Sequence, residues 1–293
     1  MGPGIQIRIG IEDLTRDWKK LSLTKKEGEK LDLSKNKKTQ VFVLATKFFT
    51  RRSLNVEAVA KTFRPLWCTR KAFEVSDVGE NRLVFAFQTA EDVEKVLMGE
   101  PWSFDRHLVV FQRYELSTPI EDLNFSKVAF WVQIHNLPYS LLTTEVAVRL
   151  EESLGEVNVP NDTTEMRGGN FMRVRVTIDI AEPLCRGRRV DFDEDNEGWV
   201  SFQYERLPNL CYWCGHLTHD DKECALWLRS KGTLSVQDQQ CGSWIRASQF
   251  NPARKSIVEV QGYETMPGAS KMRGGLVGRD KTDTGPVSWK RGV

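Results

Sequence analysis

The chain of 293 residues is poor in cysteine and histidine, with six of the first and four of the second. This low cysteine content does not fit a small secreted domain held by disulfides, and it favours reduced thiols. No apolar run reaches the length of a membrane-spanning helix, and residues 1–20 lack the apolar core and cleavage site of a signal peptide. We therefore expect a soluble intracellular protein, in the nucleus or the cytoplasm, with no membrane partner.

An excess of charge of one sign is also missing, since 42 Lys and Arg face 40 Asp and Glu. The distribution of charge is more informative than the net value of +2. Lysines crowd residues 19–38, and Arg186, Arg188 and Arg189 form a second basic group. Such groups often contact phosphate backbones, and solvated surface charge is the alternative.

Catalytic motifs are absent as well. The sequence contains no Gly-rich phosphate loop, no nucleophile elbow and no H-E-x-x-H helix. His107 and His135 lie on or beside apolar strands, where a structural histidine is the usual finding. We therefore predict that the protein is not an enzyme and has no small-molecule substrate.

Residues 39–116 alternate between strand and helix patterns. Strand patterns cover 40–49, the two arms of 71–89 and 104–114, and helix patterns cover 55–67 and 89–102. The order β-α-β-β-α-β predicts a ferredoxin-like domain with four antiparallel strands and two helices on one face. RNA-recognition motifs (RRMs) share this fold and stack bases on aromatics of the open face. Phe85 and Phe87 fit that alternation, but a place in the core under the helices is the favoured interpretation.

Residues 127–208 predict a second, smaller antiparallel α+β unit, with no clear residue-level repeat of the first. A strand at 128–138 precedes a helix at 143–155, a short strand at 155–160, a strand at 171–180 and a hairpin at 185–208. The strand at 171–180 alternates apolar residues with Arg173 and Arg175, which is typical of a half-solvated strand.

The scarce cysteines and histidines gather in one short segment. Cys211, Cys214, His219 and Cys224 have the spacing C-x2-C-x4-H-x4-C. Three thiolates and one imidazole suit a closed tetrahedral site for one structural Zn²⁺ ion. So short a loop has no apolar core, so metal binding has to supply its folding free energy. His216 is the competing ligand, but it follows Cys214 too closely for the usual loop, so His219 is favoured.

This segment resembles the CCHC zinc knuckle of retroviral and retrotransposon nucleocapsid proteins, which bind single-stranded nucleic acid. Gly215 and the aromatic Tyr212 match that family, and the resemblance implies that Tyr212 stacks on an unpaired base. Trp213 beside it is a second candidate, with packing against the preceding domain as the alternative. Thr218 replaces a usual glycine. The acidic residues inside the knuckle, which would repel phosphates, are Asp220, Asp221 and Glu223.

Longer stretches such as AFWVQIHNLPYSLL and YERLPNLCYWCGH resemble a large plant family. Its members join a domain of unknown function to a CCHC knuckle and derive from LINE-type (non-LTR) retrotransposons. The resemblance covers roughly residues 37–250. It implies a gag-like protein with an RRM-like first domain, of the kind that coats the RNA of an element.

Together these features predict a zinc-dependent binder of single-stranded RNA or DNA of the retrotransposon gag type. The alternative is a protein–protein interaction or self-association module with a purely structural zinc ion and with exposed tryptophans, Trp199, Trp227 and Trp244, as anchors. For Trp244, docking back on the domain is the favoured interpretation. The predicted nucleic-acid contacts are Tyr212, Trp213, Arg173, Arg175, Arg186, Arg188 and Arg189. The predicted organisation is a basic N-terminal arm (1–38), the ferredoxin-like (RRM-like) domain (39–116), the small α+β unit (127–208), the CCHC zinc knuckle (209–226), a post-knuckle segment (227–255) and a disordered tail (256–293).

Overall fold

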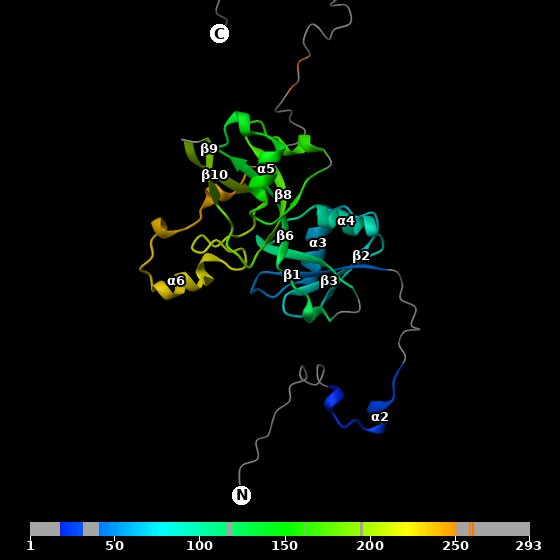
Figure 1. Ribbon diagram of the computed structural model, residues 1–293. Helices are drawn as coiled ribbons and strands as arrows, with labels where there is room; N and C mark the ends of the chain where they lie inside the picture. Colours follow the sequence, from blue (N-terminus) through cyan, green and yellow to red (C-terminus); the bar gives the residue numbers. More distant parts are fainter. Residues whose placement is uncertain are drawn as a thin grey trace, which may run out of the picture.

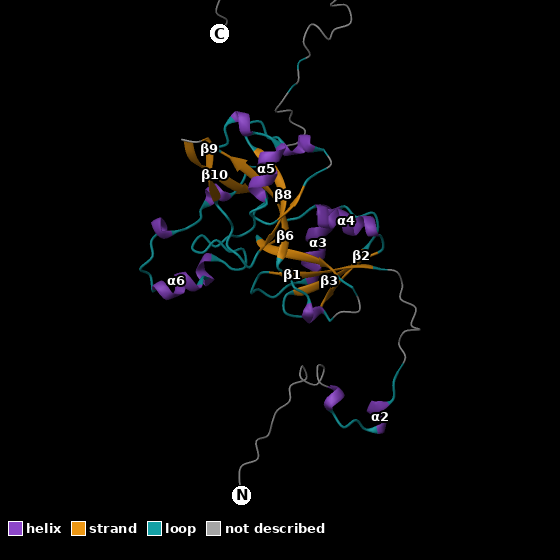
Figure 2. Cartoon of the chain, viewed as in Figure 1, coloured by secondary structure: helices purple, strands orange, loops and turns teal. Residues whose placement is uncertain are grey.

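The computed structural model describes residues 18–31, 41–115, 119–160, 162–193, 196–248, 250, 258 and 260. Most of the predicted N-terminal arm and nearly all of the predicted C-terminal tail lie outside these residues. Within them the protein is a mixed α+β structure with two antiparallel sheets, followed by the knuckle segment (Figures 1 and 2). No helix in this described part has the length and apolar character needed to span a membrane.

The first sheet has five strands in the order β2-β3-β1-β5-β4, and all neighbouring strands are antiparallel. The predicted last strand at 104–114 is corrected to a hairpin, because Asp105 and Arg106 turn the chain with φ of 48° and 67°. The other predicted strands and both helices of this segment are present. The elements are β1 (Phe42–Phe48), α3 (Val56–Trp67), β2 (Phe73–Asp77), β3 (Arg82–Phe87), α4 (Ala90–Met98), β4 (Trp102–Phe104) and β5 (His107–Arg113).

The core of the first unit lies between this sheet and its two helices. Phe85 and Phe87 are fully buried in it, and Phe85 packs on Phe63 of α3 with ring centroids 6.3 Å apart. These two phenylalanines are therefore core residues, which confirms the interpretation favoured from the sequence, and they are not available for stacking on bases. Each helix begins where a polar side chain caps it: Asn55 accepts from the N–H of Ala58, and Thr89 accepts from that of Asp92.

The second sheet also has five strands, in the order β7-β8-β6-β10-β9. If β6 to β10 are matched in chain order with β1 to β5, this is the strand order of the first sheet. The chain therefore contains two units with the same strand order and no visible sequence repeat. The second unit has no counterpart of α4, because residues 180–186 run from β8 to β9 without forming a helix. Its elements are β6 (Lys127–His135), α5 (Thr144–Glu151), β7 (Glu156–Asn158), β8 (Met172–Asp179), β9 (Gly187–Asp193) and β10 (Asn196–Tyr204).

The two units share a packed boundary. Successive residues of β5 point to opposite faces of the first sheet, so Val109 and Phe111 join its own core. Leu108 and Val110 face the other way and belong to the buried cluster of the second unit. The face of the first sheet that carries no helix is therefore partly covered by the second unit.

Short elements complete the chain. They are α2 (Lys25–Gly28), α6 (Ala225–Ser230) and the 3₁₀ turns η1 (Trp18–Lys20), η2 (Ile120–Asp122), η3 (Tyr139–Leu141), η4 (Thr163–Met166), η5 (Asp221–Glu223), η6 (Val236–Asp238) and η7 (Ser243–Ile245). One glycine is fixed by close approach of two segments: a Cβ on Gly155, between α5 and β7, would lie 2.2 Å from the carbonyl oxygen of Thr177.

Candidate metal centre

The backbone of the knuckle forms a tight turn at its first two cysteines. The N–H of Gly215 donates to the carbonyl of Cys211 at 2.8 Å, and the N–H of Cys211 donates to the carbonyl of His216 at 2.9 Å. Gly215 has φ of 78°, a left-handed conformation that favours glycine. The turn therefore explains why glycine follows Cys214.

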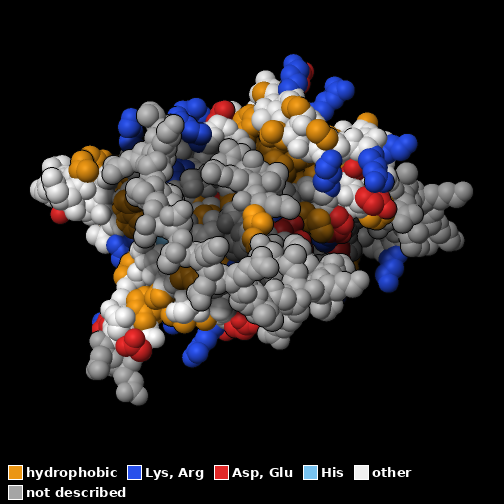
Figure 3. All heavy atoms as spheres, turned by 90° about the horizontal axis from the view of Figure 1, so that it is seen from above, with side chains coloured by type: hydrophobic (Ala, Val, Ile, Leu, Met, Phe, Trp, Pro, Cys, Tyr) orange, Lys and Arg blue, Asp and Glu red, His pale blue; other side chains and the backbone are white. Residues whose placement is uncertain are grey.

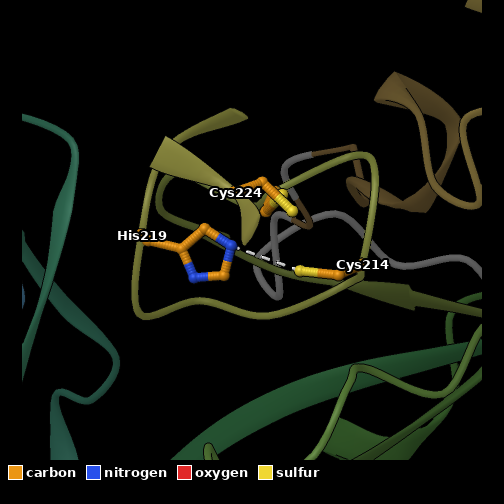
Figure 4. A group of neighbouring side chains, drawn as sticks. Cys214, His219 and Cys224 are labelled. Atoms are coloured by element: carbon orange, nitrogen blue, oxygen red, sulfur yellow. Dashed lines mark hydrogen bonds between the residues drawn. The ribbon is translucent and has the colours of Figure 1, made fainter. Parts of the chain in front are cut away.

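The turn brings four ligand atoms together. The sulfur atoms of Cys211, Cys214 and Cys224 and a ring nitrogen of His219 all lie within 4.8 Å of one another. Figure 4 shows His219 pointing toward Cys214, with Nε2 and Sγ 3.3 Å apart. Thiolates at about 2.3 Å from a tetrahedral Zn²⁺ lie about 3.8 Å from one another, so this group fits the ion. The four residues fit one structural zinc ion, as the spacing predicts.

His216, the competing ligand, lies outside this group. Its Nε2 is 3.1 Å from the carbonyl oxygen of Ala181, and its Nδ1 is 3.3 Å from the sulfur of Cys214. It therefore connects a ligand sulfur to the segment between β8 and β9. A contact from a neighbouring side chain to a ligand atom helps to orient that ligand toward the metal.

Two of the ligand thiols are hard to ionise without a metal. Burial raises the pKa of Cys211 and of Cys214 above the usual value for a thiol. Burial opposes ionisation of Cys224 too, but the N–H groups of Trp227 and Leu226 point at its sulfur, and its pKa is lowered. Zinc binding therefore has to displace protons, which makes the affinity for zinc dependent on pH.

Trp213 packs against the predicted zinc ligands. It is buried and stacks on Trp227, with ring centroids 4.9 Å apart and an interplanar angle of 12°. The pair packs against Cys211 and Cys224. Trp213 therefore packs within the knuckle region and not against the preceding domain, as the alternative had it, and its burial does not favour stacking on a base.

The knuckle is packed against the second unit. The N–H of Leu184 donates to the carbonyl of Gly215 at 2.8 Å, and Leu210, Leu217 and Cys241 belong to the buried cluster of the second sheet. Residues 180–186, which stand where the first unit has α4, form one side of this contact. The knuckle and the segment after it therefore complete the core of the second unit.

Two acidic residues of the knuckle, Asp220 and Glu223, face the first unit. Glu223 lies 3.4 Å from the guanidinium of Arg51, and Asp220 lies 3.4 Å from Nε2 of His107. Asp220 also accepts a hydrogen bond from the side chain of Asn209 at 2.9 Å. These carboxylates connect the knuckle to the first unit and to the preceding linker, a role the sequence alone did not predict.

Arg173 and Arg175 do not lie on a solvated face, so the expectation of a half-solvated strand is wrong here. Arg173 is buried, donates two hydrogen bonds to the carboxylate of Glu205 at 2.9 and 3.0 Å, and stacks over Trp131. Arg175 donates to the carbonyls of Leu97 and Met98 at the end of α4. Both arginines are held by structural contacts, because the end of α4, Ser248 and Phe250 cover this face.

The other predicted arginines, Arg186, Arg188 and Arg189, are exposed on or next to β9. Arg186 donates to the carbonyl of Gln240 at 2.9 Å, and Arg189 pairs with Glu197. This basic group therefore lies on the surface. In the sheet it is separated from Arg173 and Arg175 on β8 by the strands β6 and β10.

Comparison with known proteins agrees with this division of the chain. Residues 37–120 match a family described as "Domain of unknown function (DUF4283)", and residues 178–226 match one described as "Zinc knuckle". "Uncharacterized protein At4g02000" of Arabidopsis thaliana is 29% identical over 137 residues, which cover 45% of this chain and 42% of that protein. The match thus spans less than half of that relative. The chain therefore carries a domain of the DUF4283 type followed by a zinc knuckle, and it is a distant relative of this Arabidopsis protein.

Proposed function

We propose that this protein binds single-stranded RNA or DNA through its zinc-stabilised knuckle. The observation that carries the proposal is the position of Tyr212, a half-buried aromatic residue directly next to the ligand Cys211. Zinc knuckles bind single-stranded nucleic acid, and an accessible aromatic next to the zinc ligands provides a surface for a base.

The backbone of Tyr212 is fixed on both sides. Its N–H donates to the carboxylate of Asp221, and its carbonyl accepts from the N–H groups of Gln240 and Cys241. A backbone held in this way does not have to be ordered when a base stacks on the ring, so more of the stacking energy, about 1–3 kcal/mol per base, contributes to affinity.

The first unit supports a different role from that of an RRM. Its strand order is consistent with the proposed ferredoxin-like fold. Phe85 and Phe87 are buried, however, and Leu108 and Val110 on the opposite face pack against the second unit. We therefore assign base stacking to the knuckle and treat the first unit as its support.

The gag-type role and the retrotransposon origin belong to the same proposal. They rest on the resemblance of residues 37–250 to the plant family and on the order of the two matched families, a domain of unknown function followed by a knuckle. We also propose that the protein is not an enzyme, which a nuclease assay with added Mg²⁺ or Mn²⁺ tests directly.

Fluorescence anisotropy with a short single-stranded RNA tests the binding function. We expect binding by the zinc-loaded protein, loss of binding after chelation and about 5- to 150-fold weaker binding by Tyr212→Ala, which corresponds to the loss of about 1–3 kcal/mol of stacking. Tyr212→Phe keeps the ring and is expected to bind like the wild type, and Tyr139→Ala removes an exposed tyrosine from another surface. Binding that is unchanged by chelation and by Tyr212→Ala would contradict a role for the knuckle.

A second candidate function is an interaction or assembly module. It is favoured by two exposed tryptophans, Trp199 on β10 with 47% of its surface accessible and Trp244 in η7 with 52%. Exposed tryptophans commonly anchor protein interfaces. Light scattering of nucleic-acid-free protein distinguishes the candidates, because a strict monomer that binds RNA removes the need for this second function.

A further inference from the structure

We propose that the strand of nucleic acid enters a cleft between the first unit and the knuckle, where Arg52 and Arg106 bind its phosphates while Tyr212 stacks on a base. This inference rests on the proposed function and extends it to residues of the first unit. The cleft has a volume of about 780 Å³, and all three side chains line it. This volume is within the range of about 300–1,000 Å³ that is typical of ligand sites.

The walls of the cleft come from parts of the chain that are distant in sequence. Arg52 follows β1, and Arg106 is in the turn between β4 and β5, so the first unit supplies one wall. Residues 207–210, Tyr212 and Lys222 supply the linker and knuckle side. The segment after the knuckle contributes one further lining residue, Arg246. Neither unit alone therefore forms the site.

The charge of the cleft favours an anion. Four cationic side chains line it, Arg52, Arg106, Lys222 and Arg246, and none of them forms an ion pair with a carboxylate of the described residues. Among the described residues, the guanidinium of Arg246 donates to the carbonyls of Leu207 and Pro208 and faces no carboxylate in an ion pair.

The two carboxylates of the cleft are already engaged. Asp220 accepts from Asn209 and faces His107, and Asp221 accepts from the N–H of Tyr212. They are therefore less available to pair with the arginines of the cleft. The four cations outnumber the two carboxylates of the lining, so the cleft keeps a net positive charge (4 − 2 = +2) while the acids hold the knuckle in place.

The cleft is also held open by contacts between its walls. The N–H of Asn209 donates to the carbonyl of Arg106 at 2.6 Å, and Glu223 pairs with Arg51, the neighbour of Arg52. These contacts fix the knuckle relative to the first unit before any ligand binds. A preformed site loses less ordering free energy on binding.

Other basic surfaces lack this combination. In Figure 3, Lys and Arg side chains are spread around the visible face and do not form one block. A second hollow of about 800 Å³ at the end of α3 has cations such as Arg64 and Lys71, but it contains none of the knuckle residues. It therefore provides a matched control for the loss of positive charge.

The experiment measures anisotropy of a labelled single-stranded RNA over a range of salt concentrations. We expect Arg52→Ala/Arg106→Ala to weaken binding about tenfold and to reduce the log–log salt slope by about 1.4, or about 0.7 for each phosphate contact. Arg64→Ala/Lys71→Ala removes the same charge and is expected to leave both values close to those of the wild type. Arg52→Lys/Arg106→Lys keeps the charge and is expected to retain most of the slope.

Zinc content and circular dichroism of each variant establish that the fold is intact. If Tyr212→Ala and chelation abolish binding while Arg52→Ala/Arg106→Ala binds like the wild type, the cleft is excluded and the proposed function stands. If both double alanine variants weaken binding equally, the effect is a general one of charge, and the cleft is again excluded. Absence of binding by the zinc-loaded wild type overturns both the cleft and the proposed function.

Discussion

A single carboxyl group at the boundary between the two units makes the stability of the fold depend on pH. Glu100 follows α4, and its carboxylate accepts a hydrogen bond from the N–H of Ala129 in β6 at 3.3 Å. Burial raises the pKa of Glu100 to about 7, and this effect outweighs the hydrogen bond and the nearby positive charge of Arg175. The folded protein therefore holds a proton that the unfolded chain releases at much lower pH.

The size and sign of the effect follow from this difference. The pKa of Glu100 is about 7 in the folded protein and 4.5 for an ordinary glutamate, and a difference of 2.5 units corresponds to about 3 kcal/mol. Because the folded state binds the proton more tightly, this contribution is complete below pH 4.5. It is lost as the pH rises toward 7, and it is absent above that value. Glu100→Gln keeps the shape without the charge, so we expect this loss to disappear in the variant.

Urea unfolding followed by tryptophan fluorescence at pH 5, 6, 7 and 8 measures the difference directly. We expect the free energy of unfolding of Glu100→Gln to rise relative to the wild type by about 2–3 kcal/mol between pH 5 and pH 8. Glu91→Gln removes an exposed carboxylate from α4, the helix that precedes Glu100, and controls for the loss of one charge. If Glu100→Gln and the wild type follow parallel curves over this range, the argument that burial controls Glu100 is refuted.

Three further predictions concern stability and the metal. Arg173→Met removes the ion pair of the largely buried carboxylate of Glu205 and leaves it the hydrogen bond from Gln133; it is expected to destabilise the protein by about 3 kcal/mol, with partial recovery in Arg173→Met/Glu205→Leu, and urea unfolding measures both. Glu151 is buried without a hydrogen-bond partner among the described residues, and burial raises its pKa, so Glu151→Leu is expected to raise the melting temperature at pH 8; an unchanged or lower value contradicts this. Zinc is expected at one ion per chain, with affinity that falls as the pH falls because Cys211 and Cys214 must lose protons; mass spectrometry of the metal and competition with a chelator at pH 6 and pH 8 check this.

The zinc ligands could be predicted from the sequence because their geometry is local. All four lie within fourteen residues (224 − 211 + 1), so the spacing between them nearly determines the shape of the loop. The preference for His219 over His216 followed from the same constraint. Most helices and strands were also predictable, since their hydrophobic periods and capping residues, such as Asn55 and Thr143, act over a few positions.

Features that depend on distant contacts could not be predicted in this way. The alternation of β8 correctly indicated two faces, but it carried no information on what covers the second face. Arg173 is buried there against Glu205 and Phe250, and Arg175 is half-buried against the end of α4. The same strand order in both units is another such feature, since it resides in pairing rather than in residue identity.

The knuckle region contributes to the hydrophobic core of the second unit, so its zinc ion has a structural role beyond the loop that it folds. In the first unit two helices cover the core, whereas the second unit has α5 alone and places Leu210, Leu217 and Cys241 of the knuckle region in its buried cluster. The ion that folds the loop from Cys211 to Cys224 therefore also completes a hydrophobic core and fixes a wall of the cleft beside Arg52. Zinc, the second unit and the cleft are consequently coupled in this protein, and a knuckle excised from the chain would lack the cations of the first unit that the bound strand is proposed to need.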